Sequence, residues 1–383
     1  MTTVSRGLWV RYGGDPITRE QVEFAAQHYA VALVQPGERE AARQLKELNP
    51  NIIVLAYKCL SSARRYEESA PYTSGVSYSE AEAQGWFARR LNGDKIEWNG
   101  YWGHYQMRVW DASYRSRWTQ NVVEEIADSP FDGVLADNDI YGDYYGLNFP
   151  LEGAESIEVV HRGLDALISE AGQALNARGK ILVPNIAESR RDEGKWERHS
   201  AYGGGFEEVF LGWGPNEFLD ANSSVAQIKQ MMPSPQANLR NFMQGEQAQG
   251  EGRLTLLRAS TDGDLQHPNF LMALAAFWIF GGGQWSAVTA GAHDAHNDTP
   301  WVEELAWDLG QPTGPIEGAL GIYGRSFEKG WAAVNLTDQV SPALNFPGSG
   351  HANGTISIPP HQGMLVQAQD DGGLIIARRF DLQ

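Results

Sequence analysis

The segment FDGVLADNDIYGDYYG, residues 131–146, decides the fold. Its first part, 131–137, is a mostly apolar run that ends abruptly in Asp-Asn-Asp. Similar apolar runs recur along the chain at residues 7–13, 30–35, 51–57, 180–185, 206–213, 253–260 and 284–291. Most of them are continuous rather than alternating, which is typical of parallel strands buried on both faces.

Amphipathic segments lie between several of these runs. Helical periodicity is found at residues 17–29, 38–50, 113–130 and 156–179, and an eighth helix is expected at 300–310. Alternating strands and helices predict an α/β protein with a (β/α)8 TIM barrel, whose active site lies at the carboxyl ends of the strands. We assign residues 1–312 to this barrel, with a long aromatic insert at about 60–113. We expect the insert to shape the substrate site, and the alternative is that it only caps the barrel.

The pattern changes after residue 312. Short strand-like segments follow, punctuated by Gly, Pro and Asn. Residues 313–383 therefore predict a small antiparallel domain of the β-sandwich type. Because no flexible linker separates the two regions, we expect them to pack tightly.

The composition limits the possible partners. The formal net charge of −18 argues against nucleic acid and anionic membranes, which both need a basic face. The 13 Trp and 14 Tyr residues suit stacking on sugars, although a large core uses them equally well. The single cysteine, Cys59, excludes an intramolecular disulfide and lies in an apolar run, which predicts an inert buried thiol.

No secretory signal and no membrane-spanning run is visible in the sequence. We therefore expect no membrane insertion, and either a cytoplasmic or a virion-associated protein. The sequence makes no prediction of oligomeric state.

In a barrel, the side chains just past the carboxyl ends of the strands line the active site. Here they include Arg11, Tyr12, Lys58, Asp137, Asn138, Asp139, Asn185, Glu188, Glu207, Glu208, Asp262, Asp264, His293, Asp294 and His296. A set rich in carboxylates is typical of glycoside hydrolysis, in which one carboxyl protonates the leaving oxygen and another attacks or activates water. This chemistry needs no cofactor.

Asp137 is the leading candidate for the nucleophile. Alternation along GVLAD, 133–137, places Leu135 and Asp137 on one face, and Asp139 shares that parity. A turn or helix-capping role is the alternative for both aspartates. For the acid/base, Glu208 is favoured over Glu207 and Asp262, provided that the sixth strand ends near it.

Two metal sites were weighed as alternatives. Residues 137–148 have the spacing of a calcium loop, but Asn148 stands where that loop needs a bidentate Glu. The histidines of HDAH, 293–296, are three apart, but no third convergent ligand stands out. A solvated loop is the simpler interpretation of both segments, and we predict no metal site.

Two stretches carry a resemblance to a known family. VWDASYRSRWTQNV, 109–122, followed by SPFDGVLADND, 129–139, resembles the strand-three-to-four region of the hypothetical glycoside-hydrolase-like family fifteen, whose members have (β/α)8 barrels. The matching positions are Asp111, Tyr114, Arg115, Trp118, Asp132, Gly133, Val134, Asp137 and Asn138. The C-terminal region is similar to the β-domain of such proteins at Phe327, Gly330, Val334, Asn335, Pro360 and Gly363.

A more distant similarity connects the chain to the clan of α-galactosidases and α-glucosidases. There the nucleophile is an aspartate ending strand four, and the acid/base is on strand six. The resemblance implies Asp137 and Glu208 in these roles and retention of configuration. The clan usually has an aspartate as acid/base, so Glu208 departs from the pattern.

The expected substrate is an oligo- or polysaccharide, such as a bacterial cell-wall or exopolysaccharide. The residues expected to bind it are Trp9, Arg11, Lys58, Trp102, Trp110, Asp111, Asn138, Asp139, Tyr141, Tyr144, Asn185 and Asp262. The aromatic ones would stack on sugar rings. Two other function classes stay open: a non-catalytic glycan-binding protein such as a phage tail component, and a metal-dependent barrel hydrolase.

Overall fold

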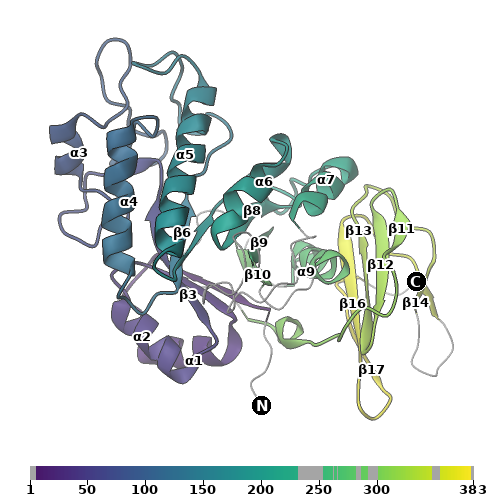
Figure 1. The fold of residues 1–383 in the computed structure, drawn as a ribbon. Helices are drawn as coiled ribbons and strands as arrows, with labels where there is room; N and C mark the ends of the chain where they lie inside the picture. Colours follow the sequence, from purple (N-terminus) through teal and green to yellow (C-terminus); the bar gives the residue numbers. More distant parts are fainter. Residues whose placement is uncertain are drawn as a thin grey trace.

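The computed structural model describes residues 6–231, 253–261, 263–264, 266–281, 286–291, 301–346 and 354–380. These residues form a mixed α/β fold in which parallel sheets and separate antiparallel sheets occupy different parts of the molecule (Figure 1). The predicted α/β class and the predicted antiparallel sheet near the C-terminus are both confirmed.

All eight predicted parallel strands are present. One sheet has the order β1 (Leu8–Arg11), β2 (Val31–Val34), β3 (Ile53–Cys59), β6 (Gly133–Asp137) and β7 (Ile181–Pro184). A second sheet contains β8 (Gly204–Phe210), β9 (Leu254–Ser260) and β10 (Ser286–Gly291). Isolated parallel bridges connect the two sheets at both ends, Asn185 with Phe206 and Gly7 with Val288.

Helices follow most of these strands. They are α1 (Arg19–His28), α2 (Arg39–Leu48), α4 (Ala112–Ile126), α5 (Ile157–Asn176), α6 (Lys195–His199), α7 (Ala221–Met231) and α9 (Pro268–Phe280), with short 3-10 turns η1 (Ser189–Arg191) and η2 (Ser200–Tyr202). The first begins with a capping box in which Thr18 and Gln21 satisfy each other's backbone N–H groups. The four helices predicted before residue 180 are confirmed.

The helix predicted at 300–310 is wrong. Among residues 301–310, only a 3-10 turn forms, η3 (Glu303–Ala306). The apolar side chains of this segment pack in different directions. Trp301 contacts the rings of His28 and Tyr29, whereas Leu305 and Leu309 enter the core. A single helical face could not serve these separate partners.

The aromatic insert after β3 is a folded structure. It contains a two-stranded antiparallel sheet, β4 (Ser62–Arg64) with β5 (His104–Gln106), and the short helix α3 (Tyr78–Gln84). Trp86 and Trp98 are buried in it, while Trp102 is 69% exposed. Its buried aromatic side chains join the cores of the parallel strands, because Trp86 packs in the same cluster as Val54 and Trp98 in the same cluster as Leu55.

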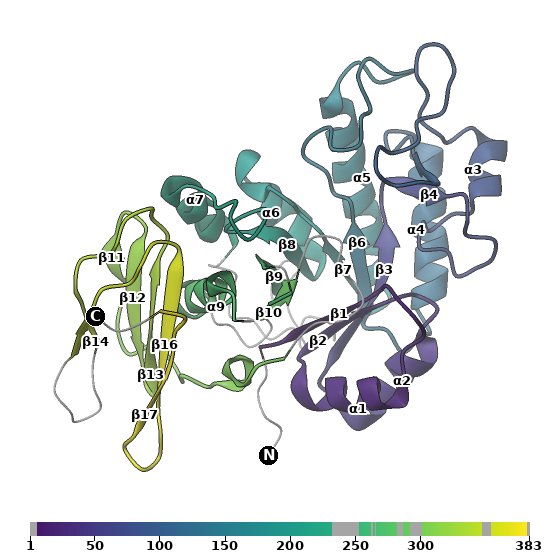
Figure 2. The same ribbon diagram turned by 180° about the vertical axis from the view of Figure 1, so that it is seen from behind.

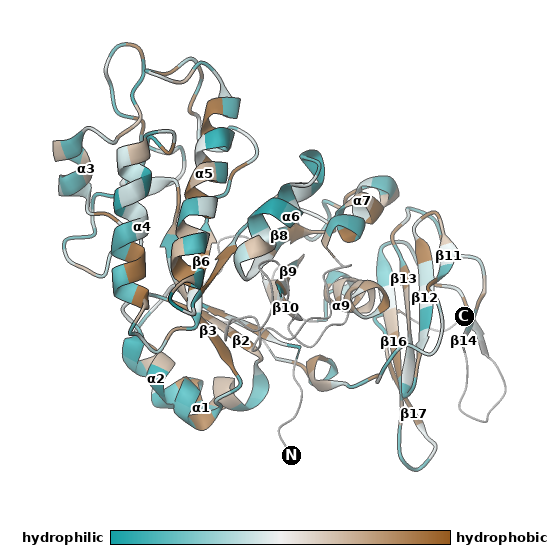
Figure 3. Ribbon diagram, viewed as in Figure 1, coloured by the Kyte–Doolittle hydropathy of each residue, from teal (hydrophilic) through white to brown (hydrophobic). Residues whose placement is uncertain are grey.

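Two cores lie on opposite faces of the parallel strands. The interior core includes Leu55, Leu135 and Phe206, and an outer core fills the space between the strands and helices α1 to α5. Figure 3 shows this pattern: the strands are in hydrophobic colours, and the helices around them carry hydrophilic residues.

The C-terminal region forms a separate layer (Figure 2). Its main sheet has the order β11 (Glu317–Ala319), β12 (Ile322–Phe327), β13 (Gly330–Asn335), β16 (Gln362–Ala368) and β17 (Leu374–Ala377), and a hairpin pairs β14 (Leu344–Phe346) with β15 (Gly354–Ile356). One face of the sheet packs on α9, so that Phe277, Ala332 and Leu365 share one core. The tight packing of the two regions is confirmed.

Helix α9 is apolar on all sides because it is enclosed between the parallel strands and the C-terminal sheet. It is only 13 residues long. Within the described ranges, no helix combines the length and the apolar character needed to cross a bilayer.

Candidate active site

The interior face of the parallel strands leads to one cluster of polar residues. The interior core takes one side chain from each of four neighbouring strands, namely Leu135, Val183, Phe206 and Leu256. Two positions further toward the carboxyl ends stand Asp137, Asn185, Glu208 and Arg258. Because side chains alternate along a strand, these four polar residues occupy the same interior face at the ends of β6, β7, β8 and β9.

Asp137 is held by four hydrogen bonds. Its Oδ1 accepts from Asn185 Nδ2 at 2.9 Å and from the backbone N of Asn138 at 2.8 Å. Its Oδ2 accepts from Tyr57 Oη at 2.7 Å and from Asn138 Nδ2 at 3.0 Å. All four donors are neutral. They fix the orientation of a half-buried carboxylate without supplying an opposite charge.

Tyr57 links Asp137 to the insert. Its hydroxyl accepts from Arg64 Nη2 at 3.0 Å, and its ring stacks on Tyr12 with centroids 4.6 Å apart. Burial, and secondly the charge of Asp137, raise the pKa of Tyr57 well above its ordinary value, so the phenol remains a hydrogen-bond donor. The sequence analysis missed this residue. Its position in the apolar run 51–57, on the interior face of β3, is the signal that could have identified it.

Tyr145 lies close to both candidate catalytic carboxylates. Its hydroxyl donates to Asn138 Oδ1, and its ring stacks on Trp98 with centroids 3.8 Å apart. Burial raises the pKa of Tyr145, and the negative charges of Asp137 and Glu208 raise it further. Both carboxylates therefore act on the same phenol. Neither Tyr145 nor Trp98 was among the predicted site residues.

Glu207 and Glu208 are neighbours with different environments. Glu207 is fully buried, and its Oε1 accepts from the backbone N of Val209 at 3.1 Å and of Glu188 at 3.3 Å. Burial raises the pKa of Glu207 to about 7. Glu208 is half-buried on the interior side. A shift in the β8–β9 register between Glu207 and Phe210 shows a bulge at this point, a feature that re-aims side chains next to active sites.

Three buried polar atoms near the strand ends have no hydrogen-bond partner within the described part of the chain. They are Asn185 Oδ1, Arg258 Nη2 and Thr289 Oγ1. Arg258 and Thr289 are register partners on β9 and β10, and Arg258 Nη1 donates to Gly291 O at 2.9 Å. Unsatisfied buried polar atoms are costly, so a cluster of them is a candidate for ligand contacts.

Asp139 lies apart from this cluster. β6 ends at Asp137, and Asn138 takes a left-handed backbone conformation with φ of 67°, which breaks the alternation that would have kept Asp139 on the interior face. Asp139 is buried between Lys195, 3.1 Å away, and His199, 2.6 Å away. These opposite charges lower the pKa of Asp139 to about 2 despite its burial.

Three more predicted residues face the helices. Lys58 is completely buried and forms an ion pair with Glu125 at 2.7 Å. Trp9 belongs to the outer core and stacks on Tyr29. Arg11 is buried and donates to the carbonyl oxygens of Gly13 and Asp15. None of the three shares the interior face with Asp137.

Five other residues predicted to bind substrate lie in three places. Tyr144 donates a hydrogen bond to Glu188, and its ring contacts Tyr145 edge-on at 6.4 Å, which places it next to the interior cluster. Trp102 is exposed on the insert and stacks on Tyr66 with centroids 6.2 Å apart. The remaining three lie beside helices α4 and α5: Trp110 is half-buried, Asp111 caps α4, and Tyr141 stacks on His161.

The acidic loop after β6 directs its carboxylates apart. Asp137 belongs to the interior cluster, whereas Asp139 lies between Lys195 and His199. Asp143 accepts hydrogen bonds from the backbone N–H groups of Leu147 and Asn148. In the described part of the chain, no group of three or more His, Cys, Asp and Glu residues is arranged to hold a metal ion. Asp262 and the HDAH segment, 293–296, lie outside the described residues.

Comparison with solved structures finds similar folds at low identity. A maltogenic α-amylase, AmyB from Thermotoga neapolitana, is 10% identical, with 97% of this chain and 95% of that chain covered and a TM-score of 0.49. Ega3 from Aspergillus fumigatus, in complex with galactosamine, is 11% identical, with 79% and 96% covered and a TM-score of 0.45. A cycloalternan-degrading enzyme from Trueperella pyogenes is 13% identical, with 80% of this chain and 47% of that chain covered and a TM-score of 0.46.

No curated protein matches the chain. A family model does match, over residues 46–331, and it describes the hypothetical glycosyl hydrolase family 15. The match covers β3 to β12 and includes Asp137, Glu208 and Arg258. It confirms the resemblance found in the sequence. The chain belongs to the hypothetical glycosyl hydrolase family 15.

Proposed function

We propose that this protein is a retaining glycoside hydrolase that cleaves an oligo- or polysaccharide at the mouth of a closed (β/α)8 barrel. The bridges between β7 and β8 and between β10 and the residue before β1 support closure, because they connect the two parallel sheets at both ends. We infer a barrel over residues 1–312, followed by a β-domain over 313–383. The interior cluster then lies at the carboxyl ends of the barrel strands, where such enzymes carry their active sites.

Asp137 is the proposed nucleophile. One of its oxygens forms a bond to the anomeric carbon while the bond from that carbon to the leaving oxygen breaks, and a covalent glycosyl ester results. The neutral donors Tyr57, Asn138 and Asn185 support this role, since they orient the carboxylate and leave its charge for the oxocarbenium-like transition state. Tyr57 is then a positioning residue for the nucleophile.

Glu208 is the proposed acid/base. It donates its proton to the leaving oxygen in the first step, and in the second it accepts a proton from the water that attacks the ester. The single observation that carries this assignment is the position of Glu208, which is half-buried near the end of β8 and two residues beyond Phe206 of the interior core, just as Asp137 stands two residues beyond Leu135. Glu207 is less suited, because it is fully buried, its Oε1 accepts from the backbone N of Val209 and of Glu188, and its Oε2 accepts from Ser189 Oγ.

The unsatisfied atoms beside these carboxylates suit the hydroxyl groups of a sugar. Arg258 Nη2 is a donor, Asn185 Oδ1 is an acceptor, and Thr289 Oγ1 can be either. Tyr144 and Trp102 offer aromatic faces to further sugar units. No cofactor enters this mechanism, because a nucleophile and an acid/base are sufficient.

The test is a reducing-end assay of the purified protein over a panel of bacterial polysaccharides and their oligosaccharides, with Asp137→Asn as the matched control. We expect product from the wild type, a loss of turnover of about 10³-fold or more in Asp137→Asn, and a melting temperature within a few degrees. Proton NMR of the first-formed anomer should show retention. An active Asp137→Asn protein would refute the assignment.

The same assay separates the alternatives. Binding to a glycan without any product would favour a non-catalytic glycan-binding protein. Product formation that is abolished by a chelator and restored by added metal would favour a metal-dependent hydrolase.

A further inference from the structure

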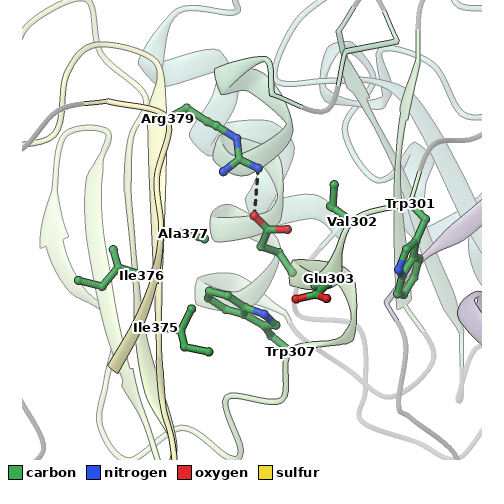
Figure 4. Close-up of a pocket in the computed structure, with 9 residues that line it drawn as sticks. Trp301, Val302, Glu303, Trp307, Ile375, Ile376, Ala377 and Arg379 are labelled. Atoms are coloured by element: carbon green, nitrogen blue, oxygen red, sulfur yellow. Dashed lines mark hydrogen bonds and ion pairs between the residues drawn. The ribbon is translucent and has the colours of Figure 1, made fainter. Parts of the chain in front are cut away.

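A cavity lies between η3 and the C-terminal sheet, far along the chain from the residues of the proposed active site. It has a volume of about 440 Å³ and opens between the turn at Glu303–Ala306 and strand β17 (Figure 4). Neither the proposed catalytic pair nor any residue predicted to bind substrate lines it. Its volume falls within the usual range of small-molecule sites, about 300–1,000 Å³.

One side of the cavity is apolar. Trp307 faces it from the segment after η3, and Ile375 faces it from β17 (Figure 4). Ile375 and Ile376 are 39% and 37% exposed. Neighbouring residues of a strand point to opposite faces, so the side chain of Ile376 points to the other side of β17, and Ile376 borders the cavity only along the edge of the strand. β17 is the terminal strand of its sheet, which supplies that edge.

The other side of the cavity is polar. Glu304 Oε1 and Arg379 Nη2 form an ion pair at 3.0 Å, and both side chains are largely buried. Arg379 Nε has no hydrogen-bond partner within the described residues. Glu303 is exposed and also lines the cavity. A guanidinium with an unused donor therefore lies beside two carboxylates and an indole face.

The walls are anchored to the rest of the molecule. Leu305 of η3 is buried in the core, and its carbonyl oxygen accepts from the backbone N of Arg6 at 2.7 Å. On the opposite wall, Ala377 is buried and pairs with Leu365 of β16. Because both walls are fixed by backbone pairing and burial, the cavity is formed before any ligand arrives, which lowers the entropic cost of binding.

We propose that this cavity is a second glycan-binding site, which holds a neutral sugar unit of the polymer on which the enzyme acts. A pyranose ring has an apolar face of C–H groups and a rim of hydroxyls. The indole of Trp307 suits the face, while Arg379, Glu303 and Glu304 suit the rim. The choice of a glycan as ligand rests on the proposed function.

Charge and geometry narrow the class of ligand. Two carboxylates and one guanidinium line the cavity, and the chain carries a net charge of −18, so an acidic polysaccharide is disfavoured. A peptide added to the edge of β17 is the main alternative. That strand has four residues, about 13 Å at the usual rise, which offers few backbone hydrogen bonds to an added strand.

The test uses native gels of the full chain that contain dextran, soluble starch, xylan or galactomannan, with alginate as the acidic comparison. The wild type should be retarded by at least one neutral polysaccharide and not by alginate. Trp307→Ala should weaken that retardation about fivefold, since the loss of one stacking contact is worth about 1 kcal/mol. Trp307→Phe should retain most of it. Leu320→Ala removes an exposed apolar side chain from the turn between β11 and β12, away from the cavity, and serves as the matched control.

Retardation and hydrolysis are scored separately. Retardation that depends on Trp307 in a protein that cleaves nothing supports this site and refutes the proposed function. Hydrolysis by a protein that no neutral polysaccharide retards overturns this site alone. Equal retardation of the wild type and Trp307→Ala also overturns it, because binding then occurs elsewhere.

Discussion

Charged residues on the two sides of the parallel strands differ in what surrounds them. Away from the interior cluster, two buried charges have an opposite charge beside them: Lys58 has Glu125 at 2.7 Å, and Asp139 has Lys195 at 3.1 Å. Buried pairs of this kind are strongly destabilising to break, because the remaining partner is left charged and buried.

On the interior side, Asp137 and Arg258 are held by neutral groups. Asp137 accepts hydrogen bonds from a phenol, two side-chain amides and a backbone N–H, and Arg258 donates to a carbonyl. Such contacts orient a charge without neutralising it. The comparison indicates that the outer charges serve the stability of the fold, while the interior charges remain available to a substrate.

Glu208→Gln should have the largest effect, and it tests the proposed role of an interior carboxylate in catalysis. We expect kcat to fall about 10²- to 10⁴-fold, because an amide cannot transfer the proton, while the melting temperature stays nearly constant. With a substrate that has an activated aryl leaving group, the variant should regain most of the rate of the first step, since that group leaves without protonation. The neighbouring variant Glu207→Gln is the matched control. Equal losses of kcat in both variants would contradict the assignment of Glu208 rather than Glu207 as the acid/base.

Asp139→Ala tests whether the buried ion pairs outside the interior cluster stabilise the fold. Removal of this carboxylate leaves Lys195 and His199 buried without it, so the free energy of unfolding should fall by about 3–5 kcal/mol. Urea unfolding measures the change, and Asp94→Ala on the exposed surface provides the control. A change below about 1 kcal/mol would mean that the network does not carry the stability assigned to it.

Glu207→Gln tests the fully buried carboxyl through its pH dependence. The folded-state pKa of about 7 is above the ordinary 4.5, so the native state binds the proton more tightly than the unfolded state does. The wild type should lose stability as pH rises from about 4.5 to 7, by at most about 3 kcal/mol at 1.36 kcal/mol per pKa unit. The variant should lack this loss. Parallel urea titrations at pH 5 and pH 8 compare the two proteins, and equal slopes would contradict the assignment.

Much of the fold could be predicted because buried parallel strands have a strong signal. Continuous apolar runs such as 131–137 mark every one of the eight strands. The helix expected at 300–310 failed because its apolar side chains have partners in different directions, a tertiary effect that periodicity cannot report.

The site was predictable only as far as strand alternation extends. Asp137 and Asn185 meet as alternation implies, with a hydrogen bond of 2.9 Å between them. Asp139 does not join them, because a single left-handed residue, Asn138, turns the chain. Tyr145 and Trp98 could not be found from spacing, since they come from a loop and from the insert and meet only in the folded protein.

The central claim is that Asp137 forms a covalent bond to the sugar. An activated 2-deoxy-2-fluoro glycoside of the sugar that the wild type releases should accumulate the intermediate, because the fluorine slows its hydrolysis. After proteolysis, tandem mass spectrometry locates the adduct. We predict a single modified peptide with the sugar on Asp137. An adduct on another carboxylate, or no adduct together with an inverted product, would contradict the account.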